Sequence, residues 1–156
     1  MDWLTLGGYV LAAMAAGSTG AMFKPGEWYK RLTKPSWTPP DWLFPVAWTV
    51  LYAAMVAAAY RMAKSGDPLA QPALAFWAAQ IALNAVWSPV FFGARRVGAA
   101  LVVLSGLWLA VAATVVLSFR VDLLSGFLLL PYLVWASYAG ALNAWIWRNN
   151  PGAKDL

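Results

Sequence analysis

The residue types that perform most protein chemistry are missing from this chain, which has no cysteine and no histidine among its 156 residues. This composition excludes disulfides, thiolate nucleophiles, Cys/His metal sites, His-ligated haem and any imidazole base. A polar series remains at Gln80, Asn84 and Ser88, spaced four residues apart and followed by Pro89. On a helix, this spacing places the three side chains on one stripe. The stripe either hydrogen-bonds neighbouring helices or lines a polar patch in a cavity.

Aromatic contact is the most abundant binding chemistry in the chain, because it carries eleven tryptophans. Tryptophan is enriched at membrane interfaces, where its N–H reaches water and its ring stays apolar. Trp48, Trp87, Trp108 and Trp135 instead lie well inside long uncharged runs, where each needs a partner for its indole N–H. Core packing explains any one of them, and we assign Trp108 to packing. Together they favour an aromatic cage for a flat apolar ligand.

Apolar helices are the elements that must position these residues. The chain is 62% hydrophobic and 11% charged, whereas soluble chains carry about 25% charged residues. Its charges are clustered and leave five uncharged intervals, each long enough for a membrane-crossing helix. We therefore predict an all-α membrane protein, a five-transmembrane-helix bundle with a structured loop capping one end. It forms one domain, 1–156, with spans at about 3–23, 42–60, 73–94, 97–119 and 123–147.

The cap loop at 24–41 is rich in proline, basic and aromatic residues, which favours an ordered segment over a disordered one. With five spans, eight basic residues share the side of this loop: Lys24, Lys30, Arg31, Lys34, Arg95, Arg96, Arg148 and Lys154. Three lie on the other side: Arg61, Lys64 and Arg120. In an inner membrane, the positive-inside rule places the cap loop and the C-terminus in the cytoplasm, while the choice between inner and outer membrane stays open. Lipid phosphates account for charges at span ends, so no nucleic-acid partner is expected.

Small residues at four-residue spacing allow helices to approach closely in lipid. On the third predicted span, Ala75 is followed by Ala79 and Ala78 by Ala82. These positions either pack within one bundle or form the seam of a homodimer.

Several motifs resemble those of the TspO/MBR family, the tryptophan-rich sensory proteins that include the animal translocator proteins. The run KPSWTPPDWLFPVAWTVLY at 34–52 is similar to the family signature. NAVWSPVFFG at 84–93, PYLVW at 131–135 and Leu142 with Asn143 resemble later blocks of the family in the same order. The resemblance covers nearly the whole chain.

The resemblance implies a five-helix bundle, commonly a homodimer, with a ligand cavity closed by the first loop. Family members bind porphyrins such as protoporphyrin IX, sterols including cholesterol, and synthetic drugs. The residues expected to bind ligand are Tyr29, Trp37, Trp48, Asn84, Trp87, Ser88, Trp135 and Ala139. The basic residues expected to meet porphyrin carboxylates are Lys24, Lys30, Arg31 and Lys34. The animal proteins carry a Tyr directly after the Leu-Asn pair, and Ala144 at this position disfavours tight cholesterol binding.

Our leading hypothesis is a membrane sensor or translocator that binds protoporphyrin IX, without an obligatory cofactor or metal. One alternative is photo-oxidative porphyrin degradation, in which Trp48 and Trp135 would be the redox-active groups. Another is a regulatory partner protein that needs no ligand.

Overall fold

The described part of the chain, residues 2–153 of a computed structural model, is almost entirely helical. It contains six α-helices and one π-helical segment, and no β-strand occurs within these residues. The elements are α1 (Trp3–Met22), α2 (Glu27–Arg31), α3 (Leu43–Lys64), α4 (Ala70–Ser88), η1 (Pro89–Gly93), α5 (Val97–Val121) and α6 (Leu123–Asn149). The predicted all-α class is confirmed.

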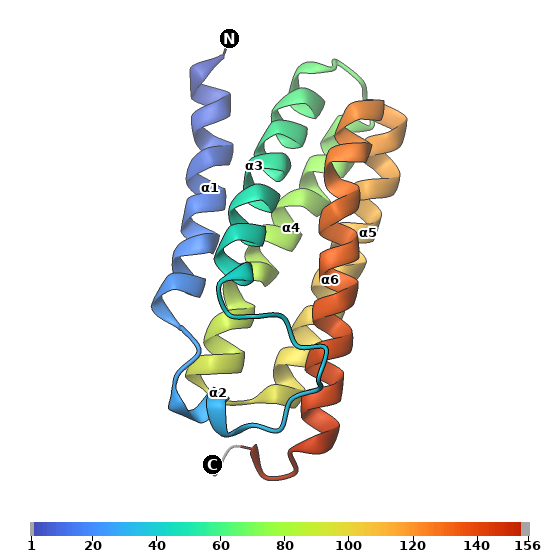
Figure 1. The fold of residues 1–156 in the computed structure, drawn as a ribbon. Helices are drawn as coiled ribbons and strands as arrows, with labels where there is room; N and C mark the ends of the chain where they lie inside the picture. The colour runs from blue at the N-terminus through green and yellow to red at the C-terminus, as the bar shows by residue number, and fades with distance from the viewer. Residues whose placement is uncertain (1, 154–156) are drawn as a thin grey trace.

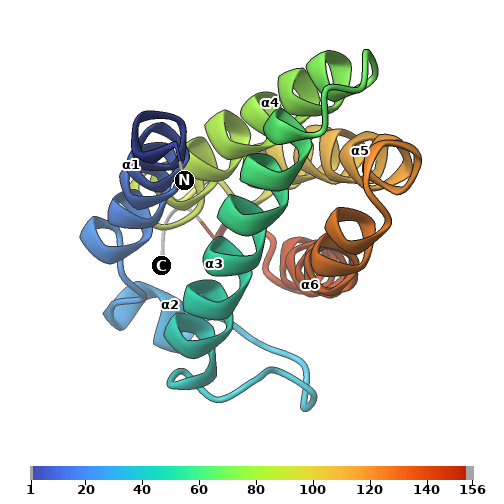
Figure 2. The same cartoon turned by 90° about the horizontal axis from the view of Figure 1, so that it is seen from above.

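The long helices form one bundle (Figure 1). α5 packs against α4 and α6, α3 packs against α6, and α1 packs against α3 and α4. Viewed from above, α1 lies at the periphery, and the short α2 lies near the end of α1 (Figure 2). The described C-terminal residues lie at the same end as α2 (Figure 1). This end of the bundle is called the loop end below.

Within residues 2–153, four helices are long and apolar enough to cross a membrane: α3, α4 continued through η1, α5 and α6. α1 is not among them, because Gly7, Gly8 and the run GSTG at 17–20 lower its hydropathy. Length and composition therefore give four candidate spans, where the sequence pattern predicted five.

Several predicted span boundaries moved, and at the ends of α3, α5 and α6 the helix continues past a charged residue: Arg61, Arg120 and Arg148, respectively. α3 continues beyond residue 60 to Lys64, and α4 begins at Ala70, before the predicted residue 73. Ion pairs hold the charges added to α3: Arg61 Nε lies 2.8 Å from an oxygen of Asp122, and Lys64 Nζ lies 2.6 Å from one of Asp2. Helix geometry continues across polar residues wherever their charges are paired or reach water.

Pro89 changes the end of α4. Proline has no N–H to donate within a helix, and here the backbone widens into the π-helical η1, in which Ala94 N donates to Pro89 O at 2.8 Å. Arg96 N then donates to Val90 O at 3.1 Å, and between them Arg95 takes φ 55°. This turn joins η1 to α5.

The cap loop is tied to the end of α6. Asn150 Oδ1 accepts from Thr33 N at 2.8 Å, and Asn150 Nδ2 donates to Thr33 O at 2.9 Å. The indole N–H of buried Trp28 donates to Ala153 O at 2.6 Å. The loop then runs between α2 and α3 past α6, as Figure 1 shows. These contacts join the residues before α3 to those after α6.

Candidate functional site

A continuous polar network lies in the middle of the bundle, among α3, α4 and α6. Tyr52 OH donates to Asn84 Oδ1 at 2.8 Å, and Asn84 Nδ2 donates to Tyr132 OH at 3.0 Å. Tyr132 OH donates to Gln80 Oε1 at 2.8 Å, and Gln80 Nε2 contacts Met55 Sδ at 3.5 Å. Gln80 and Tyr132 are each only 1% exposed. Such a satisfied network fixes the positions of three helices relative to one another.

The ring contacts of the described aromatic residues form two large groups, besides the separate pairs Tyr9–Trp77 and Phe119–Phe127. The mid-bundle aromatic group consists of Trp37, Phe44, Trp48, Tyr52, Tyr132, Trp135 and Tyr138. The loop-side aromatic group consists of Trp28, Tyr29, Trp87, Phe91 and Phe92. The residues expected to bind one ligand are therefore divided between two ring clusters.

Trp48 and Trp135 are the centre of the mid-bundle aromatic group. Their ring centroids lie 6.5 Å apart with the planes 84° from parallel, an edge-to-face contact. Trp48 also contacts Tyr52 and Tyr132, which join it to the polar network. Trp135 also contacts Phe44. The two indole planes therefore lie nearly at right angles within this group.

The indole N–H groups distinguish Trp48 and Trp135 from Trp77, Trp87 and Trp108, the other tryptophans well inside the long helices. Nearer the helix ends, Trp3, Trp145 and Trp147 also donate no hydrogen bond within residues 2–153. Trp77 donates to Met55 O, Trp87 to Asn143 Oδ1 and Trp108 to Ser137 Oγ. Within residues 2–153, the N–H groups of Trp48 and Trp135 donate no hydrogen bond, although no buried side-chain nitrogen lacks a partner. Both side chains are half-buried, so both N–H groups open onto accessible space.

Tyr29 and Trp87 belong to the loop end. Trp87 stacks on Phe91, with centroids 4.9 Å apart, and contacts both hydrophobic clusters of the bundle. Tyr29 is 6% exposed, and burial raises its pKa to about 12. Its phenol is therefore protonated at neutral pH and able to donate a hydrogen bond.

The other expected ligand residues lie at the edges of these groups. Trp37, which is 44% exposed, contacts the ring of Tyr138 at 5.5 Å. Ala139 is half-buried and packs against the bundle core. Ser88 faces Gly20, where an added Cβ would lie 3.7 Å from the Ser88 hydroxyl. Ser88 thus continues the stripe towards α1 rather than into the polar network.

Two of the four basic residues expected to meet carboxylates have partners within the loop. Lys34 Nζ donates to the carbonyls of Tyr29 at 2.7 Å and Leu32 at 3.1 Å, and it lies 4.6 Å from the Tyr29 ring centre. Burial lowers the pKa of Lys34 below its ordinary value. Lys30 Nζ pairs with Glu27 at 2.7 Å, and this contact lowers the pKa of Glu27. Lys34 therefore orders the end of α2.

Lys24 and Arg31, the other two basic residues, line a pocket at the loop end with Arg95. They do not lie in the mid-bundle aromatic group. No cluster of metal-binding side chains occurs within residues 2–153.

Ala75, Ala78, Ala79 and Ala82 are exposed along α4. They do not pack inside the bundle, so their face is accessible to another chain or to lipid. Phe76 and Val86, on the same helix, are 43% and 46% exposed.

Tyr52 and Tyr132 belong to both the polar network and the mid-bundle aromatic group, and the sequence pattern did not single them out. Tyr52 follows Trp48 by four residues and so shares its helix face, a spacing that was available in the sequence. Tyr132 is adjacent to Pro131 and had no comparable signal, because its role depends on which helices meet.

These features define an all-helical membrane protein with a polar and aromatic interior. The sequence profile of the TspO/MBR family matches residues 9–148, and the chain belongs to this family. It is a multi-pass membrane protein.

Curated relatives extend over nearly the same length. "Protein CrtK" of Rhodobacter capsulatus is 51% identical over 95% of this chain and 94% of its own. "Tryptophan-rich sensory protein" of Cereibacter sphaeroides is 48% identical over 99% and 98%, respectively. The human "Translocator protein" is 40% identical over 96% and 92%. The names of the second and third relatives describe a sensory protein and a translocator protein, which supports that general kind of function for this chain.

Proposed function

We propose that this protein is a membrane sensor or translocator that binds a porphyrin, such as protoporphyrin IX, beside Trp48 and Trp135. The supporting observation is the pair of half-buried indoles whose N–H groups stay accessible while those of Trp77, Trp87 and Trp108 are occupied. The perpendicular rings offer one face and one edge to a planar ligand. A sterol or another flat apolar molecule fits the same chemistry.

Basic residues of the cap loop would meet the porphyrin carboxylates. Lys24 and Arg31 have no ion-pair partner within residues 2–153, whereas Lys30 and Lys34 already have contacts in the loop. Charge-assisted contacts of this kind are stronger than neutral hydrogen bonds.

Titration of protoporphyrin IX against the purified protein, followed by tryptophan fluorescence, tests this proposal. Each aromatic contact is worth about 0.5–1.5 kcal/mol beyond burial, so Trp48→Phe or Trp135→Phe should weaken binding roughly 2- to 12-fold. Trp108→Phe is the matched control, because Trp108 is 37% exposed and bonds Ser137. Equal affinity in all three variants would contradict the assigned site.

Photo-oxidative degradation of the bound porphyrin is the second candidate function, and the contact between Trp48 and Trp135 favours it. Illumination of the complex should then yield a porphyrin product that is absent for Trp48→Phe and Trp135→Phe. The same product from both variants excludes a tryptophan-based mechanism.

A regulatory protein that needs no ligand would keep its cellular effect when both tryptophans are replaced.

The proposed bundle has five spans, with α1 as the fifth, and the cap loop in the cytoplasm if the membrane is an inner one. The chain has no cysteine, so single-cysteine variants report sidedness directly. Gly26→Cys at the loop end and Ser65→Cys at the other end should be labelled from opposite sides. Labelling of both from one side contradicts this topology.

A homodimer through the exposed alanines of α4 is part of the proposal. Ala79→Cys should form a disulfide-linked dimer under mild oxidation. Val134→Cys, 68% exposed on α6, is the control that should stay monomeric. Equal cross-linking of both variants argues against a dimer through α4.

A further inference from the structure

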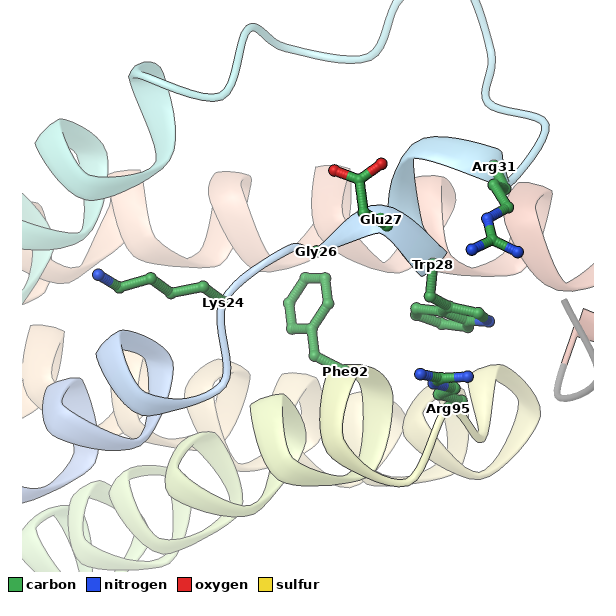
Figure 3. Close-up of a pocket in the computed structure, with 7 residues that line it drawn as sticks. All are labelled: Lys24, Gly26, Glu27, Trp28, Arg31, Phe92 and Arg95. Atoms are coloured by element: carbon green, nitrogen blue, oxygen red, sulfur yellow. The ribbon is translucent and has the colours of Figure 1, made fainter.

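A pocket of about 290 Å³ lies between α2 and the turn that follows η1. Its lining residues are Lys24, Gly26, Glu27, Trp28, Arg31, Phe92 and Arg95, drawn in Figure 3. They come from three segments that are distant in sequence: the end of α1, the α2 region and the η1–α5 turn. None of them belongs to the mid-bundle aromatic group.

The pocket has an excess of positive charge. Lys24, Arg31 and Arg95 line it together with a single carboxylate, that of Glu27. Glu27 already bonds Lys30, at 2.7 Å. Within residues 2–153, the three lining cations form no ion pair. Figure 3 shows the guanidinium groups of Arg31 and Arg95 near Trp28, whereas the Lys24 side chain points away from them. The like charges of the two arginines favour an anion placed in the pocket.

The two guanidinium groups flank one aromatic ring of the pocket lining. Figure 3 shows Arg31 and Arg95 on opposite sides of the Trp28 ring, whereas Lys24 lies beyond Phe92 with its side chain pointing away from both arginines. Trp28 is 6% exposed, and its N–H is held by Ala153 O, so the ring between the two arginines is fixed. Guanidinium groups bind phosphate oxygens through two parallel N–H bonds, which makes paired arginines suited to a phosphate.

The backbone at Arg95 adds to this argument. Its φ of 55° lies in the left-handed region, at a helix end where glycine or asparagine is the usual residue. An arginine here is less favourable for the backbone, but it projects a cation from the turn into the pocket.

We propose that this pocket binds the phosphate group of an anion, and that the bound phosphate bridges α2 to the η1–α5 turn. The chemistry fits a phospholipid headgroup or a free phosphate. Lys24 and Arg95 each follow closely on the end of a long helix, the depth at which headgroups lie beside a spanning bundle. Lys24 and Arg31 are also the residues proposed to meet porphyrin carboxylates, so the two anions would compete for them. The phosphate inference does not rest on porphyrin binding, and its test contains no porphyrin.

The test uses the full-length protein in a nonionic detergent. Calorimetric titration with inorganic phosphate detects a free anion. Native mass spectrometry with added dioleoylphosphatidylglycerol, against dioleoylphosphatidylcholine, detects a lipid adduct, and added phosphate then competes for it. If phosphate binds saturably and displaces the lipid, the site is supported and its ligand is a free phosphate from solution. A retained phosphatidylglycerol adduct that phosphate does not displace supports the site and identifies the bilayer as the source.

A charge-matched pair of variants separates the pocket from general electrostatics. Arg31→Gln with Arg95→Asn removes the two guanidinium groups, and asparagine tolerates the backbone at 95. Arg96→Gln with Arg148→Gln removes the same charge from exposed residues that do not line this pocket. The pocket pair should bind about tenfold more weakly or worse, since it loses two charge-assisted contacts, and the control pair should change binding less than about twofold.

Glu27→Gln should change the affinity for the anion in the direction opposite to that of the arginine double variant. Glu27 is the only carboxylate among the described lining residues, so its replacement by glutamine should tighten binding of phosphate or phosphatidylglycerol. Equal unfolding midpoints establish that all the variants are folded. The proposal is overturned if neither probe binds the wild-type protein, if both double variants weaken binding equally, or if Glu27→Gln weakens it.

Discussion

Replacement of Tyr132 by phenylalanine tests whether the polar network holds the helices together. The hydroxyl accepts from Asn84 Nδ2 at 3.0 Å and donates to Gln80 Oε1 at 2.8 Å. Gln80 is 1% exposed, so its oxygen cannot regain a donor from water. Leaving a buried acceptor unpaired costs about 1–3 kcal/mol, and an interhelical hydrogen bond in a membrane protein averages about 0.6 kcal/mol. Tyr132→Phe should therefore lower the free energy of unfolding by about 2 kcal/mol.

The assay is reversible unfolding in mixed micelles, with the denaturing detergent varied. Tyr60→Phe is the matched control, because its hydroxyl bonds only the backbone N of Asp2 at the end of the bundle. The control should change stability by about 0.5 kcal/mol or less. In a double-mutant cycle with Gln80→Leu, the two losses should be strongly non-additive, since the second replacement removes the orphaned acceptor. Additive losses, or a Tyr132→Phe loss no larger than that of the control, would refute the reasoning.

Three further outcomes are expected from the ends of the helices. The bonds from Arg61 hold the pKa of Asp122 well below its ordinary value, so this stabilisation is complete above about pH 5 and falls as the pH drops below about 4. Asp122→Asn should therefore reduce the loss of stability at acid pH, seen as a smaller decrease of the unfolding midpoint between pH 7 and pH 3. Gly126→Ala should cost about 1–3 kcal/mol in the same unfolding assay, because the new methyl overlaps the ring of Phe119. Asn150→Ala should accelerate amide exchange in the cap loop but not in the middle of α6, and uniform acceleration would contradict a local tether.

Periodicity and charge spacing predicted the helical class and placed the polar stripe correctly on the buried face of α4. Gln80 and Asn84 lie there because amides at four-residue spacing must share a face. Ser88 lies towards Gly20 of α1, because each four-residue step on a helix turns the face by about 40° and Ser88 stands two such steps after Gln80. Helix boundaries were less predictable, because the partners that hold Arg61 and Lys64 come from distant parts of the chain.

The pairing of Trp48 with Trp135 came from the family resemblance, which named both positions before any geometry was available. Composition could not predict that the indole N–H groups of Trp87 and Trp108 donate hydrogen bonds while those of Trp48 and Trp135 do not. This difference depends on whether Asn143 or Ser137 happens to lie within reach of an indole N–H. The sequence indicates Arg95 only as a basic residue at a span end, because its place in one pocket with Arg31 depends on how α2 folds back over η1.

The tether between Thr33 and Asn150 also orders events during synthesis. These residues are separated by 117 positions, so the ribosome adds almost the entire bundle after the cap loop has emerged. Until Asn150 and Ala153 leave the ribosome, Thr33 and the Trp28 indole lack the partners that fix them. The contacts that close the loop end therefore cannot form before residues 150–153 have been synthesised, whatever order the helices follow.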